Sequence, residues 1–188
     1  MSDYNPEFWK NAQYSTLWKK HFDNCNMLKN KLIEKFPKLK DSIKEGHAFS
    51  DQWLRFKPED KSGADLIISN PADYNVLVRV DITGSHKIDP SIKCPIWVRP
   101  DKIDQAKKQK EPYWFYCVYK SKICAVDVET ALKYRDKVKT VIIKKDIPEH
   151  YVEIPYNESI SEEKFFQKIS EYVDKIPSKI YTKQTYFK

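Results

Sequence analysis

The stretch that decides the fold is Gly63–Ser85, which reads GADLIISNPADYNVLVRVDITGS. A short apolar run at 64–69 is followed by the turn signal Asn-Pro-Ala-Asp and then by strict alternation over 76–82. This pattern predicts two strands joined as a β-hairpin, with residues 83–85 ending the second strand. Because the chain reverses near residue 73, Asp65 and Asp81 are equally far from the turn, so we expect them to lie opposite each other.

A helix is expected before this hairpin. Apolar residues recur at three- and four-residue spacing through 6–36, and His21 and Cys25 fall on the same stripe, where packing in the core is expected. Pro37 interrupts the helix. A further short helical turn is expected to end near Gly46, and residues 48–56 are expected to be extended.

After the hairpin, helices and strands alternate. Strands are expected at 95–98, 113–119, 123–126, 141–143 and 151–154, and helices at 101–110, 128–134 and 160–176. The segment 113–119 reads YWFYCVY and is apolar on both faces, which is typical of a central strand. The fold class is therefore α/β (α+β), with a mixed central β-sheet flanked by helices.

A length of 188 residues fits a single domain over 1–188. Within it we expect an N-terminal helical segment at 1–46, a core at 47–156, and a C-terminal helix and basic tail at 157–188. No apolar run approaches the roughly 18 residues of a membrane helix. The start, MSDYNPEFWK, has no apolar signal-peptide region, so a cytoplasmic protein is expected.

The charge is positive and comes mostly from lysine. There are 34 Lys+Arg and 27 Asp+Glu, giving a net charge of +7, and only four of the basic residues are arginine. On charge alone a lysine-rich solvated surface is favoured over a polyanionic partner, with which the excess is also compatible. The four cysteines form no CxxC pair, so they are expected to be reduced, buried thiols. With three glycines in the chain, a glycine-rich phosphate loop is not expected.

The pair Asp65 and Asp81 carries the expected chemistry. Two carboxylates at neighbouring strand ends provide the oxygen ligands that a hard cation such as Mg²⁺ or Mn²⁺ takes. A site of this kind can hold a phosphodiester oxygen and activate a water for in-line attack. In the alternative reading Asp65 caps a turn after Gly63, and Asp81 pairs with a basic residue at the surface.

The order of these elements resembles the PD-(D/E)xK (restriction-endonuclease-like) nuclease superfamily. The resemblance covers residues 17–135 and includes IWVRPDKIDQA at 96–106, followed by YWFYCVY and KICAVD. It implies a restriction-endonuclease-like core in which Asp65 and Asp81 bind Mg²⁺ or Mn²⁺. The cap-snatching branch of the superfamily uses a histidine just after the first helix, which suggests His47 as a further metal ligand.

The sequence departs from this family at the catalytic lysine. Thr83 stands two residues after Asp81, where the family motif has lysine, and threonine carries no charge at neutral pH. Lys87 in the following loop, or Lys102 on the following helix, is a candidate replacement, as in the cap-snatching enzymes. Otherwise the protein works without this lysine, or keeps the fold only to bind nucleic acid.

Basic residues near this site are candidates for nucleic-acid binding: Lys102, Lys107, Lys108 and Lys110, all expected on one short helix. The sequence thus predicts a metal-dependent nuclease acting on nucleic acid, on DNA in preference to RNA, with a homodimer as an arrangement that the resemblance allows. The alternative is an inactive nucleic-acid-binding or assembly protein on the same fold. A third alternative is a protein that binds another protein through the aromatic helix at 160–176.

Overall fold

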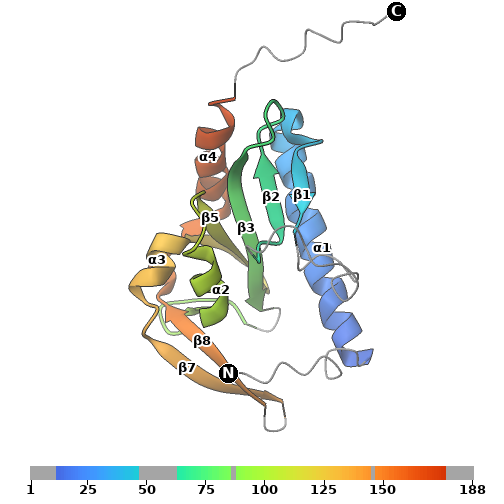
Figure 1. The fold of residues 1–188 in the computed structure, drawn as a ribbon. Coiled ribbons are helices and arrows are strands. Elements are labelled where there is room, and N and C mark those ends of the chain that lie inside the picture. Colours follow the sequence, from blue (N-terminus) through green and yellow to red (C-terminus); the bar gives the residue numbers. More distant parts are fainter. Residues whose placement is uncertain (1–11, 47–62, 86–87, 145–146, 177–188) are drawn as a thin grey trace, which may run out of the picture.

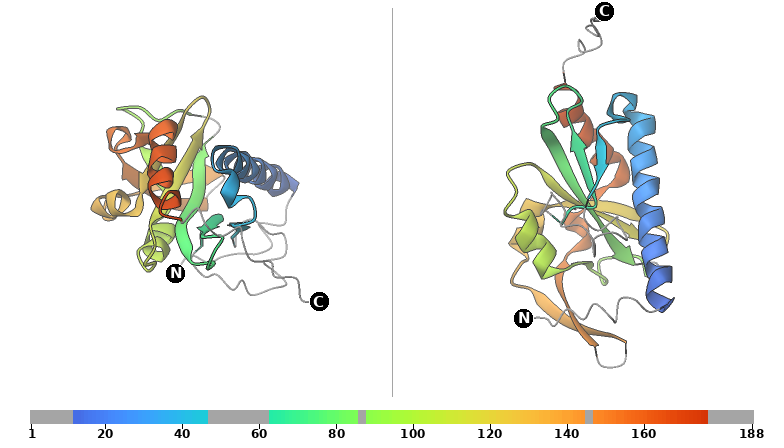
Figure 2. Two further views of the ribbon diagram at one scale, coloured as in Figure 1. Left: turned by 90° about the horizontal axis from the view of Figure 1, so that it is seen from above. Right: turned by 45° about the vertical axis from the view of Figure 1, so that its right-hand side comes forward.

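The structure is a computed structural model that describes residues 12–46, 63–85, 88–144 and 147–176. Its longest helix is α1 (Ala12–Lys35), a stretch without proline or glycine that ends just before Pro37. The 3₁₀ turn η2 (Pro37–Leu39) then leads into the first strand, β1 (Ile43–Glu45). Helix α1 runs alongside β1, β2 and β3 (Figure 2).

Six strands form the main sheet, in the order β1-β2-β3-β5-β6-β9. Their bounds, after β1, are β2 (Leu66–Ser69), β3 (Val76–Ser85), β5 (Tyr113–Tyr119), β6 (Ile123–Asp127) and β9 (Ile160–Ser161). Strands β3 and β5 pair in parallel, whereas the other neighbours pair antiparallel. The fold is therefore mixed α and β around a mixed central sheet, as the sequence predicts (Figure 1).

A second, three-stranded sheet has the order β4-β8-β7. It is formed by β4 (Ile96–Val98), β7 (Val138–Lys144) and β8 (Ile147–Ile154), and the β7–β8 hairpin extends away from the main sheet (Figure 1). Three further helices follow the hairpin β2–β3 in the chain: α2 (Pro100–Ala106), α3 (Val128–Lys133) and α4 (Glu162–Val173), with the 3₁₀ turn η4 (Tyr156–Glu158) before α4.

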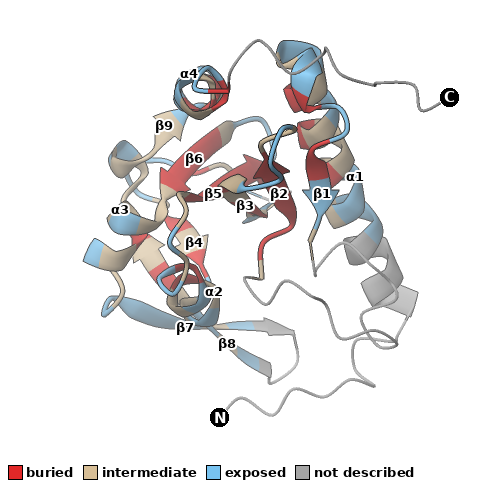
Figure 3. Cartoon of the chain, turned by 45° about the horizontal axis from the view of Figure 1, so that its top comes forward, coloured by how far each residue is buried: buried red, intermediate tan, exposed pale blue. Residues whose placement is uncertain are grey.

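The main sheet is covered on both faces. One core cluster joins α1 and α4 to the sheet, and it includes Leu28, Val80, Tyr116, Phe165 and Ile169. The other joins α2, α3 and the small sheet to the opposite face, and it includes Ile103, Phe115, Val126, Ala131 and Val152. Strand β5 is buried along its whole length, as expected for a central strand, whereas most of β7 is exposed (Figure 3).

The aromatic residues of α4 belong to this core. Phe165 and Phe166 are buried against the sheet, and Phe165 packs edge-on against Trp114 with ring centroids 5.7 Å apart. Most of the stripe on which the third alternative rests is therefore packed inside the protein.

Two local predictions are wrong for the same reason. The helical turn expected to end near Gly46 is present only as the 3₁₀ turn η2, which ends at Leu39; residues 43–45 form the strand β1 and pair with β2. The stretch 83–85, expected to end the second hairpin strand, continues β3 because Thr83, Gly84 and Ser85 pair with β5. In both places, hydrogen bonding to a strand distant in sequence overrides the local preference. The expected extended region at 48–56 lies outside the described residues.

Candidate metal and phosphate site

The hairpin β2–β3 places Asp65 and Asp81 at matching positions on its two sides. Leu66 pairs with Val80 and Ile67 with Arg79, which is the register predicted from equal spacing about residue 73. The backbone N–H of Asp65 donates to the carbonyl of Val80, and the N–H of Ile82 donates to the Asp65 carboxylate at 2.7 Å. Asp65 therefore sits across from Asp81 at the end of the hairpin, as expected, and it is also part of the backbone ladder.

Both carboxylates are fully buried, with no exposed surface. Buried carboxylates are uncommon unless they are paired, because removing a charge from water is costly. Each therefore requires a partner of opposite charge or a proton, and the structure provides a different partner for each.

The partner of Asp81 is Lys102, near the start of α2. The Lys102 ammonium donates to both carboxylate oxygens of Asp81, at 2.7 and 2.8 Å. Burial of Ile103 and Ala106 seats α2 on the sheet, and Arg135 donates to both oxygens of Asp104 at 2.8 and 2.6 Å. These contacts hold α2 in the place from which Lys102 reaches the sheet.

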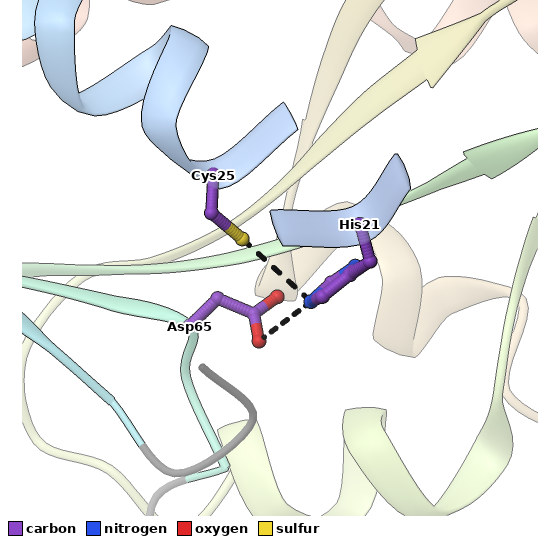
Figure 4. Close-up of side chains that lie close together, drawn as sticks. All are labelled: His21, Cys25 and Asp65. Carbon is purple, nitrogen blue, oxygen red and sulfur yellow. Dashed lines mark hydrogen bonds and ion pairs between the residues drawn. The ribbon is translucent and has the colours of Figure 1, made fainter. Parts of the chain in front are cut away.

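The partner of Asp65 is His21, on α1. Its Nε2 lies 3.2 Å from one Asp65 carboxylate oxygen, and the side chain is 24% exposed. Cys25, one helical turn later and fully buried, has its sulfur 3.6 Å from the same nitrogen. Cys25 and Asp65 both point toward the imidazole, one from the helix and one from the sheet (Figure 4).

These neighbours move the pKa values apart. Burial alone would raise the pKa of Asp65, but the hydrogen bond from His21, the charges of Lys102 and His21 and the N–H of Ile82 together lower it below its usual value. For Asp81, burial outweighs the attraction of Lys102, and the Asp65 charge adds to burial, so its pKa rises to about 7. The pKa of Lys102 is raised, because its two carboxylate neighbours outweigh the effect of burial.

The histidine and the cysteine respond to the same charges. Burial opposes the protonated form of His21, but the hydrogen bond and the charge of Asp65 outweigh it and raise the pKa of the imidazole. Burial, reinforced by the two carboxylates, raises the pKa of the Cys25 thiol well above its usual value. Cys25 is thus a neutral thiol beside a charged group, with no sign of nucleophile activation.

The other predicted residues are placed differently. Thr83 lies on β3 two residues after Asp81, on the same side of the strand, and is partly buried. Helix α2 ends at Ala106, so Lys107, Lys108 and Lys110 follow the helix in an exposed turn, which corrects the expectation that they lie on it. His47 and Lys87 lie outside the described residues.

His21 is the residue that the sequence reading missed. Its place on the apolar stripe of α1 indicated a packed core residue, and helix periodicity cannot show that this part of the stripe faces the end of the hairpin. A carboxylate entering a strand, with a histidine and a cysteine four residues apart on the preceding helix, is the signal that could have revealed it.

Comparisons of the chain with protein-family models, with curated proteins and with solved structures found no match. No described helix has the length and apolar character needed to cross a bilayer.

Proposed function

We propose that this protein is a divalent-metal-dependent nuclease. The observation that carries the proposal is the contact between the Lys102 ammonium and both oxygens of Asp81, with Asp65 across the hairpin. It supplies, from the following helix, the cation that is missing at Thr83. The order of a helix, three antiparallel strands, a helix and a strand parallel to the third also supports a restriction-endonuclease-like core.

The types of donor at Asp65 and Asp81 support Mg²⁺ or Mn²⁺ as the proposed ion. Carboxylate oxygens from Asp65 and Asp81 are the ligands that both ions take, and an imidazole such as that of His21 is compatible with Mn²⁺. Such an ion would polarise a phosphodiester and lower the pKa of a bound water. Asp81 can bind the ion only if the Lys102 ammonium releases at least one oxygen of the Asp81 carboxylate.

Asp65, Lys102 and His21 would then have different roles in the proposed reaction. Asp65 is held by the Ile82 N–H and stays ionised, so its position is fixed before any ligand arrives. Lys102 carries a positive charge beside Asp81. Once displaced from that carboxylate, its ammonium would be free to contact a phosphate oxygen. His21, which is 24% exposed, could donate to that phosphate oxygen where it does not bind the metal.

The test is cleavage of double-stranded and single-stranded DNA and of RNA with Mn²⁺, Mg²⁺ or EDTA. We expect Mn²⁺-dependent cleavage that EDTA abolishes. Asp81→Asn and Lys102→Met should each lose at least a hundredfold in rate, since each removes a charged group at the reacting site. Asp41→Asn, an exposed acid near the end of the first helical segment, should cleave like the wild type. Cleavage that persists in Asp81→Asn would refute the proposal.

A second candidate rests on the same contact read differently. Both oxygens of Asp81 are occupied by Lys102 and the carboxylate is fully buried, which is the arrangement expected of a structural ion pair. In that case the fold would bind nucleic acid without cutting it. Salt-sensitive binding with no cleavage under any of the metal conditions would select this candidate.

A further inference from the structure

We propose that His21, Cys25 and Asp65 form a second metal site, selective for a thiophilic ion such as Zn²⁺, whose occupation blocks the nuclease site. The metal-binding half of this inference stands on its own, whereas the regulatory half rests on the proposed function. The two sites share Asp65 and His21, so they cannot be filled together.

Three ligand types converge there. An imidazole nitrogen of His21, the thiol sulfur of Cys25 and a carboxylate oxygen of Asp65 all lie within 4.8 Å of one another. His21 and Cys25 are four residues apart on α1, which places both on one face of the helix, and Asp65 comes from the entry to β2 (Figure 4). A nitrogen, a sulfur and an oxygen from two elements make a mixed ligand set and not an acidic patch.

The separations match those of a tetrahedral zinc site. With Zn–S near 2.3 Å and Zn–N and Zn–O near 2.0–2.2 Å, ligand atoms in a tetrahedron lie about 3.6 Å apart for sulfur and nitrogen and about 3.4 Å apart for nitrogen and oxygen. The structure has 3.6 Å between the Cys25 sulfur and His21 Nε2, and 3.2 Å between that nitrogen and Asp65. Two of the three distances between ligand atoms are thus already close to those of a tetrahedral zinc site.

The chemistry of the ligands selects the ion. Thiolate and imidazole favour Zn²⁺ over Mg²⁺, which prefers oxygen ligands. On binding, the thiol proton of Cys25 leaves to solvent and the thiolate takes its place on the metal. Since Cys25 and Asp65 are fully buried and His21 is 24% exposed, the fourth position opens on the histidine side, where a water can complete the tetrahedron.

The structure also separates this site from Asp81. Lys102 holds both oxygens of Asp81, so the thiophilic site draws on Asp65 but leaves the Lys102–Asp81 pair intact. An ion held by Cys25 therefore removes one acid from the nuclease site and leaves the second neutralised by its lysine. Zinc would then act as an inhibitor of an enzyme that requires Mn²⁺ or Mg²⁺.

The experiment is a titration of the reduced full-length protein with Co²⁺, followed by the near-ultraviolet thiolate-to-cobalt charge-transfer band. We expect the band to saturate at one equivalent, to be removed by Zn²⁺ and to be unaffected by a large excess of Mg²⁺. Cys25→Ala should abolish it, Asp65→Asn should weaken binding at least tenfold, and Cys94→Ala, the matched control at a partly buried thiol, should keep it. A wild type without the band, or a Cys25→Ala protein that retains it, would overturn the site.

Two control experiments test separately whether the Cys25 variants fold and whether zinc inhibits cleavage through this site. Thermal unfolding of Cys25→Ala and of Cys25→Ser shows whether each variant is folded, and either folded variant suffices. If cleavage is observed, Zn²⁺ should inhibit the wild type at a concentration at least tenfold below that needed for the folded Cys25 variant, and equal inhibition of both would overturn the regulatory role. A band without cleavage refutes the nuclease and leaves the metal site standing, whereas cleavage without a band does the reverse.

Discussion

Lys102 provides the opposite charge that the buried Asp81 requires. At the residue scale, Asp81 has no exposed surface and its side-chain oxygens receive hydrogen bonds from the ammonium of Lys102. The pair is separated by 21 positions in the sequence, so it forms only when α2 is in place. The contact therefore contributes to the position of α2 as well as to the electrostatics of the site.

Removing Lys102 should destabilise the fold more than removing the whole pair. Lys102→Met leaves Asp81 buried without its partner, so the carboxyl must take up a proton or remain an uncompensated charge, and breaking a buried pair in this way costs about 3–5 kcal/mol in the free energy of unfolding. In the double variant Lys102→Met/Asp81→Asn the charge is removed as well, so most of the loss should be recovered. Urea unfolding of the two single variants and the double variant measures this coupling.

The exposed Lys107 provides the control for this cycle. Lys107→Met should stay within about 0.5 kcal/mol of the wild type, because the side chain is exposed and lies beyond the end of α2. Strictly additive losses from Lys102→Met and Asp81→Asn would show that the ion pair has no coupling energy.

Sequence alone predicted part of the site at this scale. Equal spacing about residue 73 was enough to place Asp65 opposite Asp81, because a hairpin register is fixed once its turn is known. Lys102 was one of two candidates, and the contact depends on how α2 packs, which no local pattern encodes. His21 was missed because the same spacing of apolar residues fits a side chain facing the core and one facing the sheet end.

At the scale of elements, β3 connects the two halves of the main sheet. It pairs antiparallel with β2 and parallel with β5, so it carries Asp81 between the hairpin and the central strand. Gly84 continues β3 with φ near +127°, a backbone conformation that residues with a side chain rarely adopt. A Cβ at this position would lie 1.9 Å from the carbonyl oxygen of Val118 on β5.

Gly84→Ala should therefore be strongly destabilising even though position 84 is exposed. The added methyl group meets backbone and not a flexible side chain, and the φ angle is unfavourable as well, so we expect a loss of about 1–3 kcal/mol or more. Thermal and urea unfolding measure it, with Lys120→Ala in the exposed turn after β5 as the control. An unchanged stability would mean that β3 does not approach β5 at this point.

The same element shows where sequence patterns stop being informative. The alternation of 76–82 and the doubly apolar run of 113–119 correctly predicted β3 and β5, because burial on a sheet face leaves a periodic trace. Their parallel pairing extends β3 through Thr83-Gly84-Ser85, a tripeptide that reads locally as a strand end. Strand β1 was missed in the same way, since three residues are too few to show a period.

At the scale of the whole molecule, the lysines near the site fall into two groups. Lys102 is paired with the buried Asp81, whereas Lys107, Lys108 and Lys110 are exposed in the segment after α2. Helix α4 carries further exposed lysines, but it packs on the opposite face of the main sheet. The two faces therefore allow a matched comparison of nucleic-acid binding.

We expect the α2 face to bind DNA. The slope of log K against log salt is negative. Replacing Lys107, Lys108 and Lys110 by alanine should reduce its magnitude by about 2–3, since each phosphate contact contributes about 0.9. Replacing Lys164, Lys168 and Lys175 of the α4 face and the segment just after it changes the net charge equally and should lower the slope by less than about 1. Fluorescence anisotropy at several salt concentrations measures both, and equal changes would contradict a localised surface.

The crossover between β3 and β5 also gives the site an order of assembly. The hairpin β2–β3 closes over a short turn, whereas the parallel pair β3–β5 requires the intervening chain, with β4 and α2, to fold back across the sheet. Since the hairpin closes over the shorter loop, we expect the two aspartates to meet during folding before Lys102 reaches them. Lys102 would then be the last of these three charged side chains to arrive, so the site would be completed only when the parallel pair β3–β5 has formed.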